Sequence, residues 1–200
     1  ETDVSVATSG TGRIVLIGDS LTIGSDVSSS GGSLSISATN DIVLTNFSSI
    51  SSSNTAEVVL ISDEGSVLGD SGSSIASGGS GAVIISAYQN VTLGSVTSSS
   101  NVGINATNGS FSSATGGTAN RMVVSSDTLS IIAGDAVYGE DSITGALLTD
   151  VNTLSLVGGN GAIYSISNAG DLTVGATSVS LSRLDSLLNA SAITVNSEAN

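Results

Sequence analysis

Apolar and polar residues alternate along this chain in short runs that return at nearly regular intervals. The run "LSISATNDIVL" at residues 34–44 has two apolar residues one apart, a serine, a short polar connector and two more apolar residues. The same outline recurs from Leu60, Ile84, Tyr164 and Val179. Apolar residues at every second position are typical of strands that bury one face. The pattern therefore predicts a repeated strand–turn–strand unit.

The intervals between these units predict coils of about 19–25 residues, which is the period of a solenoid. Beyond Val124 the spacing becomes irregular. The alignment uses the inner apolar residue before each connector, namely Ile17, Ile36, Ile61, Ile85, Ile104, Val124, Leu156, Ile166 and Leu181.

Most of the apolar spacing favours short strands, each bounded by Gly, Ser, Asn or Asp, which form turns. One segment, "LSRLDSLLNAS" at 181–191, also has helical spacing, although the repeat alignment favours strands there. The period-two pairs are Leu34 and Ile36, Ile42 and Leu44, Val91 and Leu93, Leu129 and Ile131, Leu172 and Val174, and Ile193 and Val195.

Few two-residue hairpin turns connect these strands, since Asn108-Gly109 is the sole Asn-Gly pair. A coil cannot bury its apolar residues alone, so equivalent residues must stack on one another. We therefore predict an all-β fold, a right-handed parallel β-helix. Residues 1–12 would form an N-terminal lead-in, and residues 13–200 a single β-helix repeat domain within a longer chain or filament.

The predicted interior is a stack of equivalent apolar residues, and the serine at a repeated position would form a hydroxyl ladder inside or beside it. The stacked residues are expected to include Ile36, Leu44, Ile61, Ile85, Leu93, Ile104, Val124, Leu156, Ile166 and Leu172.

Charge and composition exclude several classes of function. Seventeen Asp and Glu against three Arg give a net charge of −14, which repels nucleic acid and anionic membranes. No apolar run is long enough to span a bilayer, so no membrane insertion is expected. The chain has no His and no Cys, which removes conventional nucleophilic triads and zinc sites. Its lack of Cys also fits a secreted protein stabilised without disulfides.

Paired carboxylates are the remaining enzymatic option, because glycosidases use them. The candidates are Asp63 with Glu64, and the group Asp135, Glu140, Asp141 and Asp150. As an alternative, hard oxygen ligands in "GEDS" at 139–142 would suit calcium. The simpler interpretation is that these acids are solvated turn residues. We therefore expect no enzyme, no catalytic residue and no required cofactor.

Two stretches carry a resemblance to a known family. They are "LSIIAGDAVYGEDSITGALLTDVNTLSLVGGNGAIYSISNAGDLTVGA" from Leu129 and "NVTLGSVTSSSNVGINATNGSFSSATG" at 90–116. Both resemble the repeat region of filamentous haemagglutinin-like large exoproteins, which are bacterial surface or secreted adhesins built on a right-handed parallel β-helix. The similar elements are "LTDVNTL", "GGNGAIY" and "NAGDLTV", and about half of the chain matches in recognisable order. The family's secretion domain carries Asn-Pro motifs, which this proline-free chain lacks.

The resemblance implies an extracellular or cell-surface location and a parent protein that binds a cell-surface or glycan ligand. For this chain we expect a structural and adhesive role, as a stiff shaft or filament unit whose partners are flanking coils of the same or neighbouring chains. Two alternatives stay open. One is a β-helix enzyme that acts on polysaccharides through turn carboxylates, and the other is a subunit that assembles end to end through open strand edges into a fibre or sheath.

Overall fold

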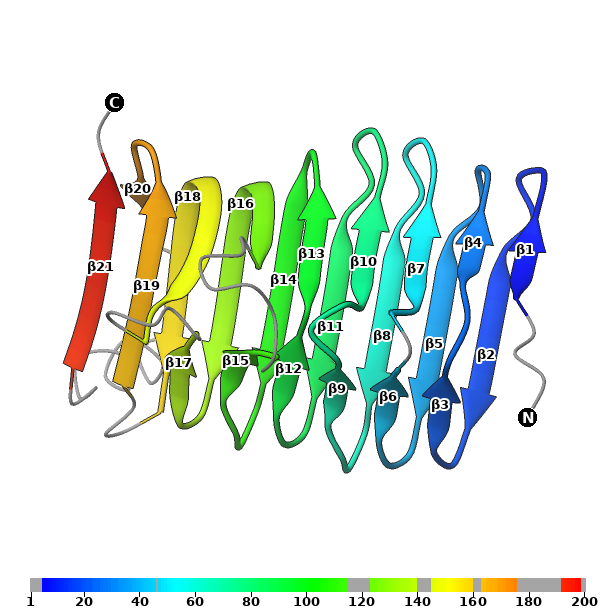
Figure 1. Ribbon diagram of the computed structural model, residues 1–200, viewed down its shortest axis with the longest axis horizontal. Coiled ribbons are helices and arrows are strands. Elements are labelled where there is room, and N and C mark those ends of the chain that lie inside the picture. The colour runs from blue at the N-terminus through cyan, green and yellow to red at the C-terminus, as the bar shows by residue number, and fades with distance from the viewer. Residues whose placement is uncertain are drawn as a thin grey trace.

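The chain winds into a stack of coils in which every described strand pairs in parallel with strands of the adjacent coils (Figure 1). The structure is a computed structural model that describes residues 5–45, 47–114, 123–139, 145–159 and 163–175, and the backbone of 192–198. Within these ranges the chain forms strands and turns and no helix. The predicted all-β, parallel β-helix fold is confirmed.

Each coil follows the same path through three columns of strands. The first column contains β2 (Ile14–Gly18), β5 (Leu34–Ala38), β8 (Val58–Ser62), β11 (Val83–Ala87) and β14 (Asn101–Ala106). The second contains β3 (Leu21–Ile23), β6 (Ile42–Leu44), β9 (Val67–Gly69), β12 (Val91–Leu93), β15 (Phe111–Ser113) and β17 (Ala136–Tyr138). The third contains β1 (Val6–Thr8), β4 (Val27–Ser29), β7 (Ser49–Ser52), β10 (Ser74–Ser77) and β13 (Ser95–Ser98).

Later strands are longer and pass from one column to the next. β16 (Val124–Ala133) and β18 (Leu147–Gly158) each continue the third column and then the first. β19 (Ile163–Ala169) continues the second column and then the third, β20 (Thr173–Val174) ends the first, and β21 (Ala192–Glu198) pairs with β19. These continuous strands explain the irregular repeat beyond Val124.

The predicted coil length holds through most of the stack, but some later steps are longer, among them those from β13 to β16, from β17 to β19 and from β19 to β21. Val83 pairs with Val102, which is a step at the short end of the predicted range. Val96 pairs with Val124, and β19 pairs with β21, through steps that exceed the long end of that range. In the coil from Val96 the additional residues lie between β15 and β16, where a connection can lengthen without changing the strand register.

The interior is an apolar column filled by one residue in two from each strand. Most of the predicted interior residues are confirmed as buried, and Leu172 packs against the column while only partly buried. Val124 and Ile166 are buried but belong to the third column and not to the first. The predicted residues that are buried are Ile36, Leu44, Ile85, Leu93, Ile104, Val124, Leu156 and Ile166.

Two predicted inner positions are wrong. Ile17 is 78% exposed and Ile61 is 37% exposed, and both face outward. Leu60 takes the interior place instead, because it pairs with Ile36 on one side and Ile85 on the other. Five residues separate Ile36 from Ile42 in the repeated run, and the same spacing before Val67 selects Ile61, whereas six residues separate Leu60 from Val67.

A column of buried serines closes the interior at the end of each third-column strand. The Ser52 hydroxyl donates to the Gly32 carbonyl at 3.0 Å, and the Ser98 hydroxyl donates to the Gly81 carbonyl at 2.8 Å. These bonds satisfy carbonyls of the turns that lead to the next coil. The predicted hydroxyl ladder of connector serines is wrong, because Ser37 and Ser86 pair with Ile61 and not with another serine. The buried serine column is a different set, made of Ser29, Ser52, Ser77, Ser98 and Ser126.

The remaining sequence predictions fall at the two ends. Residues 1–12 contain β1, which already pairs with β4. Val174 lies in a strand as predicted, yet it is 63% exposed. Ile193 and Val195 lie in β21, as predicted, and the segment 181–191 lies outside the described residues.

Candidate functional site

The described carboxylates that were predicted as an enzymatic alternative lie at three separate places on the coils. Asp63 and Glu64 are exposed in the turn between β8 and β9, and Asp135 is exposed in the turn between β16 and β17. Asp150 faces outward on β18, beside Ser125 in the third column. Glu140 and Asp141 lie outside the described residues. Asp63 and Glu64 therefore share one turn, whereas Asp135 and Asp150 lie in later coils and at different columns.

The turns between the first and second columns hold a chain of polar contacts, here called the turn relay. An Asp41 carboxylate oxygen accepts from the Ser66 amide at 2.8 Å, and the Asn90 side-chain oxygen accepts from the Ser110 amide at 3.0 Å. The Ser110 hydroxyl donates to Asp135 at 3.1 Å. Each contact joins one coil to the next, so these polar side chains hold the stack together.

From β5 onward, the connectors between the first and second columns, which carry the turn relay, alternate between two lengths. Five residues separate Ile36 from Ile42 and Ile85 from Val91, whereas six separate Leu60 from Val67 and Ile104 from Phe111. The longer connectors end in Gly-Ser, at residues 65–66 and 109–110. A Cβ atom on Gly65 would meet Asp41, and one on Gly109 would meet Asn90. Glycine therefore makes room for the acid or amide of the shorter connector in the preceding coil.

Calcium was predicted as an alternative at residues 139–142, of which 140–142 lie outside the described residues. In the part of the chain that the structure describes, no three acidic side chains gather closely enough to hold a metal ion. That part also contains no helix with the length and apolarity needed to cross a bilayer.

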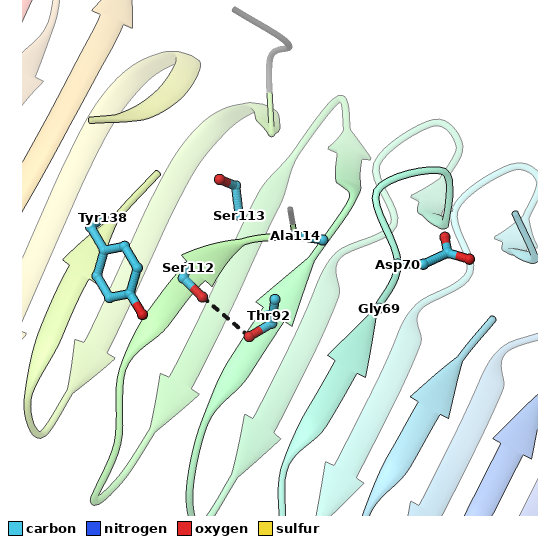
Figure 2. Close-up of a pocket in the computed structure, with 7 residues that line it drawn as sticks. All are labelled: Gly69, Asp70, Thr92, Ser112, Ser113, Ala114 and Tyr138. Carbon is cyan, nitrogen blue, oxygen red and sulfur yellow. Dashed lines mark hydrogen bonds between the residues drawn. The ribbon is translucent and has the colours of Figure 1, made fainter. Parts of the chain in front are cut away.

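A shallow groove lies on the outside of the second column (Figure 2). It has a volume of about 590 Å³. Three of its lining residues, Thr92, Ser112 and Tyr138, lie in one outward row, because Ser112 pairs with both Thr92 and Tyr138. The other lining residues are Gly69, Asp70, Ser113 and Ala114.

The polar groups of this groove are held in place by hydrogen bonds. The hydroxyls of Thr92 and Ser112 lie 3.1 Å apart, and either one can donate (Figure 2). At the opposite end from Tyr138, the two carboxylate oxygens of Asp70 accept from the Phe47 amide at 3.2 Å and the Gly72 amide at 3.0 Å. The Tyr138 side chain is 48% exposed, which leaves its ring accessible to a ligand.

The groove was not predicted from the sequence. Thr92, Ser112 and Tyr138 become neighbours only through the register of two successive coils that differ in length. The sequence gives little indication of the groove. Thr92 and Ser112 are the middle residues of two short strands, and Tyr138, one of three tyrosines, lies in the following strand of the same column.

Comparisons with known proteins identify no relative, since no protein-family model, no curated protein and no solved structure matches the chain.

Proposed function

We propose that this chain is a structural segment of an extracellular or cell-surface protein, in which it forms a stiff shaft that presents or spaces an adhesive region. The observation that carries the proposal is the unbroken parallel pairing from β1 to β21 across the described residues (Figure 1). A coil that pairs with its neighbours in three columns can neither bend nor rotate without breaking several ladders at once.

The side chains support the same conclusion. The interior is mainly apolar along its described length, and its open corners are closed by the serine column and the turn relay. These interactions repeat in coil after coil, whereas an enzyme concentrates its polar groups at one place. The resemblance to filamentous haemagglutinin-like exoproteins supports a bacterial surface adhesin as the parent.

A rod of this kind has a length set by its number of coils, which gives a direct test. Deleting residues 58–101 would join Glu57 to Val102 and remove two coils in register, because Leu34, Val58, Val83 and Val102 are successive partners. The deletion also places the Gly109-Ser110 connector next to Asp41, so the alternation of the turn relay is kept. We expect a folded rod shorter by about 10 Å, measured by small-angle scattering.

The control removes a single coil, residues 58–82. It takes away fewer residues but places the Asn90 connector next to Asp41, so that Asp41 loses the Ser66 amide. We expect this variant to melt at a lower temperature than the two-coil deletion. A two-coil variant that unfolds, or that keeps the full length, would contradict a modular shaft.

Location and assembly need the native material. Antibodies raised against this chain should label thin projections at the surface of the source cells in electron micrographs. Labelling confined to the cell interior would overturn the proposal. Micrographs would also separate a shaft within one long chain from a fibre or sheath of short chains stacked end to end.

We infer no enzymatic activity for the chain, because its described acids are exposed: Asp63 and Glu64 lie together in an open turn, and Asp135 and Asp150 lie at different columns. A screen of neutral and acidic polysaccharides for cleavage, with Asp63→Asn and Asp135→Asn as variants, tests this. Turnover that either substitution abolishes would establish the polysaccharide-acting alternative in place of the shaft.

A further inference from the structure

We propose that the groove lined by Asp70, Thr92, Ser112 and Tyr138 binds a neutral oligosaccharide. This goes beyond the shaft function, which does not require a groove. The groove crosses β9, β12, β15 and β17, which are consecutive strands of the second column. With neighbouring strands about 4.8 Å apart, it spans about 14 Å along the axis. An elongated ligand of a few sugar units fits that shape.

The chemistry of the groove matches the two kinds of surface that a sugar ring offers. A pyranose has a C–H face that packs on an aromatic ring and a rim of hydroxyls that need both donors and acceptors. The half-exposed ring of Tyr138 provides the apolar platform at one end. Ligand sites typically combine such a surface with a small number of positioned polar groups.

The polar groups between the two ends can both donate and accept. Ser112 is buried and Thr92 is partly exposed, so Thr92 is the accessible member of the pair. Because the hydrogen bond between the two hydroxyls can reverse its direction, Thr92 can donate to a ligand or accept from it. The Asp70 carboxylate is directed away from Thr92, toward the preceding coil, where the Phe47 and Gly72 amides hold it (Figure 2). It therefore contributes negative charge at that end of the groove and not a contact to a sugar hydroxyl.

Other ligand classes fit this groove poorly. Its described lining residues include a carboxylate and no basic side chain, and they would repel nucleic acids and acidic sugars. An extended peptide needs an open strand edge, whereas β12, β15 and β17 are each paired on both sides. Ala114 and Tyr138 are the lining residues with mainly apolar side-chain surface, which is too little for an amphipathic helix.

The test uses the full chain and uncharged tetrasaccharides of glucose, galactose, mannose and N-acetylglucosamine, with oligogalacturonate and a heparin tetrasaccharide as acidic comparators. Isothermal titration measures affinity, and amide shifts in two-dimensional NMR locate the site. We expect at least one neutral tetrasaccharide to bind and to shift the amides of residues 92, 112 and 138. The acidic comparators should not bind.

Variants separate the groove from a general effect on the surface. Tyr138→Ala should weaken binding roughly tenfold, and Tyr138→Phe should retain most of it if the ring is the platform. Tyr88→Ala is the matched control, because Tyr88 is 51% exposed but lies in the turn before β12, outside the groove. Both positions are exposed, so circular dichroism should show all three variants folded.

Three results would overturn the proposal: no neutral tetrasaccharide binds at millimolar concentration, the acidic comparators bind at least as well, or Tyr88→Ala weakens binding as much as Tyr138→Ala. None of these results bears on the rod length of the coil-deletion variants, so the failure of the groove and the failure of the shaft are distinguishable.

Discussion

The Tyr164 hydroxyl on β19 donates to the Ala133 carbonyl at the end of β16, at a distance of 2.9 Å. Both residues are fully buried, so the bond crosses the interior from the second column to the first. A Cβ atom on Gly158, the strand partner of Ala133, would collide with the same hydroxyl. Tyr164 therefore occupies space that only a glycine at position 158 leaves free.

Burial, with a smaller contribution from the negative charge of Asp135, raises the pKa of Tyr164 from 10.0 to about 12. The unfolded chain then loses this proton at a lower pH than the folded chain. The contribution to stability is complete below pH 10 and is lost as the pH rises through about 12. Its upper limit is on the order of 3 kcal/mol, the equivalent of two pKa units.

We expect the ultraviolet absorbance titration to contain a tyrosinate component near pH 12, and Tyr164→Phe to remove it. Gly158→Ala should displace the hydroxyl and move that component to lower pH. A titration identical in the wild type and in Tyr164→Phe would contradict the buried position.

Ile85→Asp should unfold the coils around β11, whereas Ile84→Asp should be tolerated. Ile85 is fully buried between Leu60 and Ile104, and Ile84 on the opposite face of the same strand is 40% exposed. An unpaired buried charge costs more than about 3 kcal/mol, and an exposed substitution costs less than about 1 kcal/mol. Urea denaturation followed by circular dichroism measures both. Equal losses would show that the strand has no defined inner face.

Ser52→Ala should lower the free energy of unfolding by about 1–2 kcal/mol. The substitution removes the donor to the Gly32 carbonyl, which lies in a closed corner of the interior. Ser51→Ala is the control, because Ser51 faces outward on the same strand and should change stability by less than about 0.5 kcal/mol. Chemical denaturation of both variants gives the comparison. If Ser51→Ala costs as much, the serine column has no special role.

Asn168→Ala should destabilise the C-terminal coils by about 2–3 kcal/mol. The buried Asn168 amide accepts from the Val151 amide and from the Thr149 hydroxyl, each at 2.9 Å, and donates to the Val151 carbonyl at 3.0 Å. Alanine would leave these groups buried and unpaired. Asn152→Ala removes an exposed bond to Asp127 and should be nearly neutral, which thermal melting can verify.

The inward-facing residues of a strand could be predicted from the sequence where polar residues alternate with apolar ones. Ile36 and Ile104 have polar or small neighbours on both sides, so they could be placed inside with no ambiguity. In the runs at 14–17 and 58–61 every residue is apolar, so the pattern does not distinguish the inward face from the outward face. Only stacking against the next coil decides which residues are buried. Ile17 and Ile61 were therefore assigned to the wrong face.

The groove depends on the lengths of successive coils and on the register between them, which the sequence of one strand does not contain. Thr92 and Tyr138 each contribute to it through Ser112, and that adjacency requires particular coil lengths on either side. The bend that positions Asp70 depends on amides donated by Phe47 and Gly72, the first from the preceding coil. Local patterns predict strands and turns, whereas contacts between coils also require the register.

The alternation of five- and six-residue connectors limits which duplications can add coils to such a chain. A duplication of one coil puts two connectors of the same length side by side, and the Asp or Asn of the first then has no Gly-Ser to receive it. A duplication of two coils, such as the segment from Leu34 to Ala82, keeps the match. Recombination should therefore lengthen this molecule in even steps.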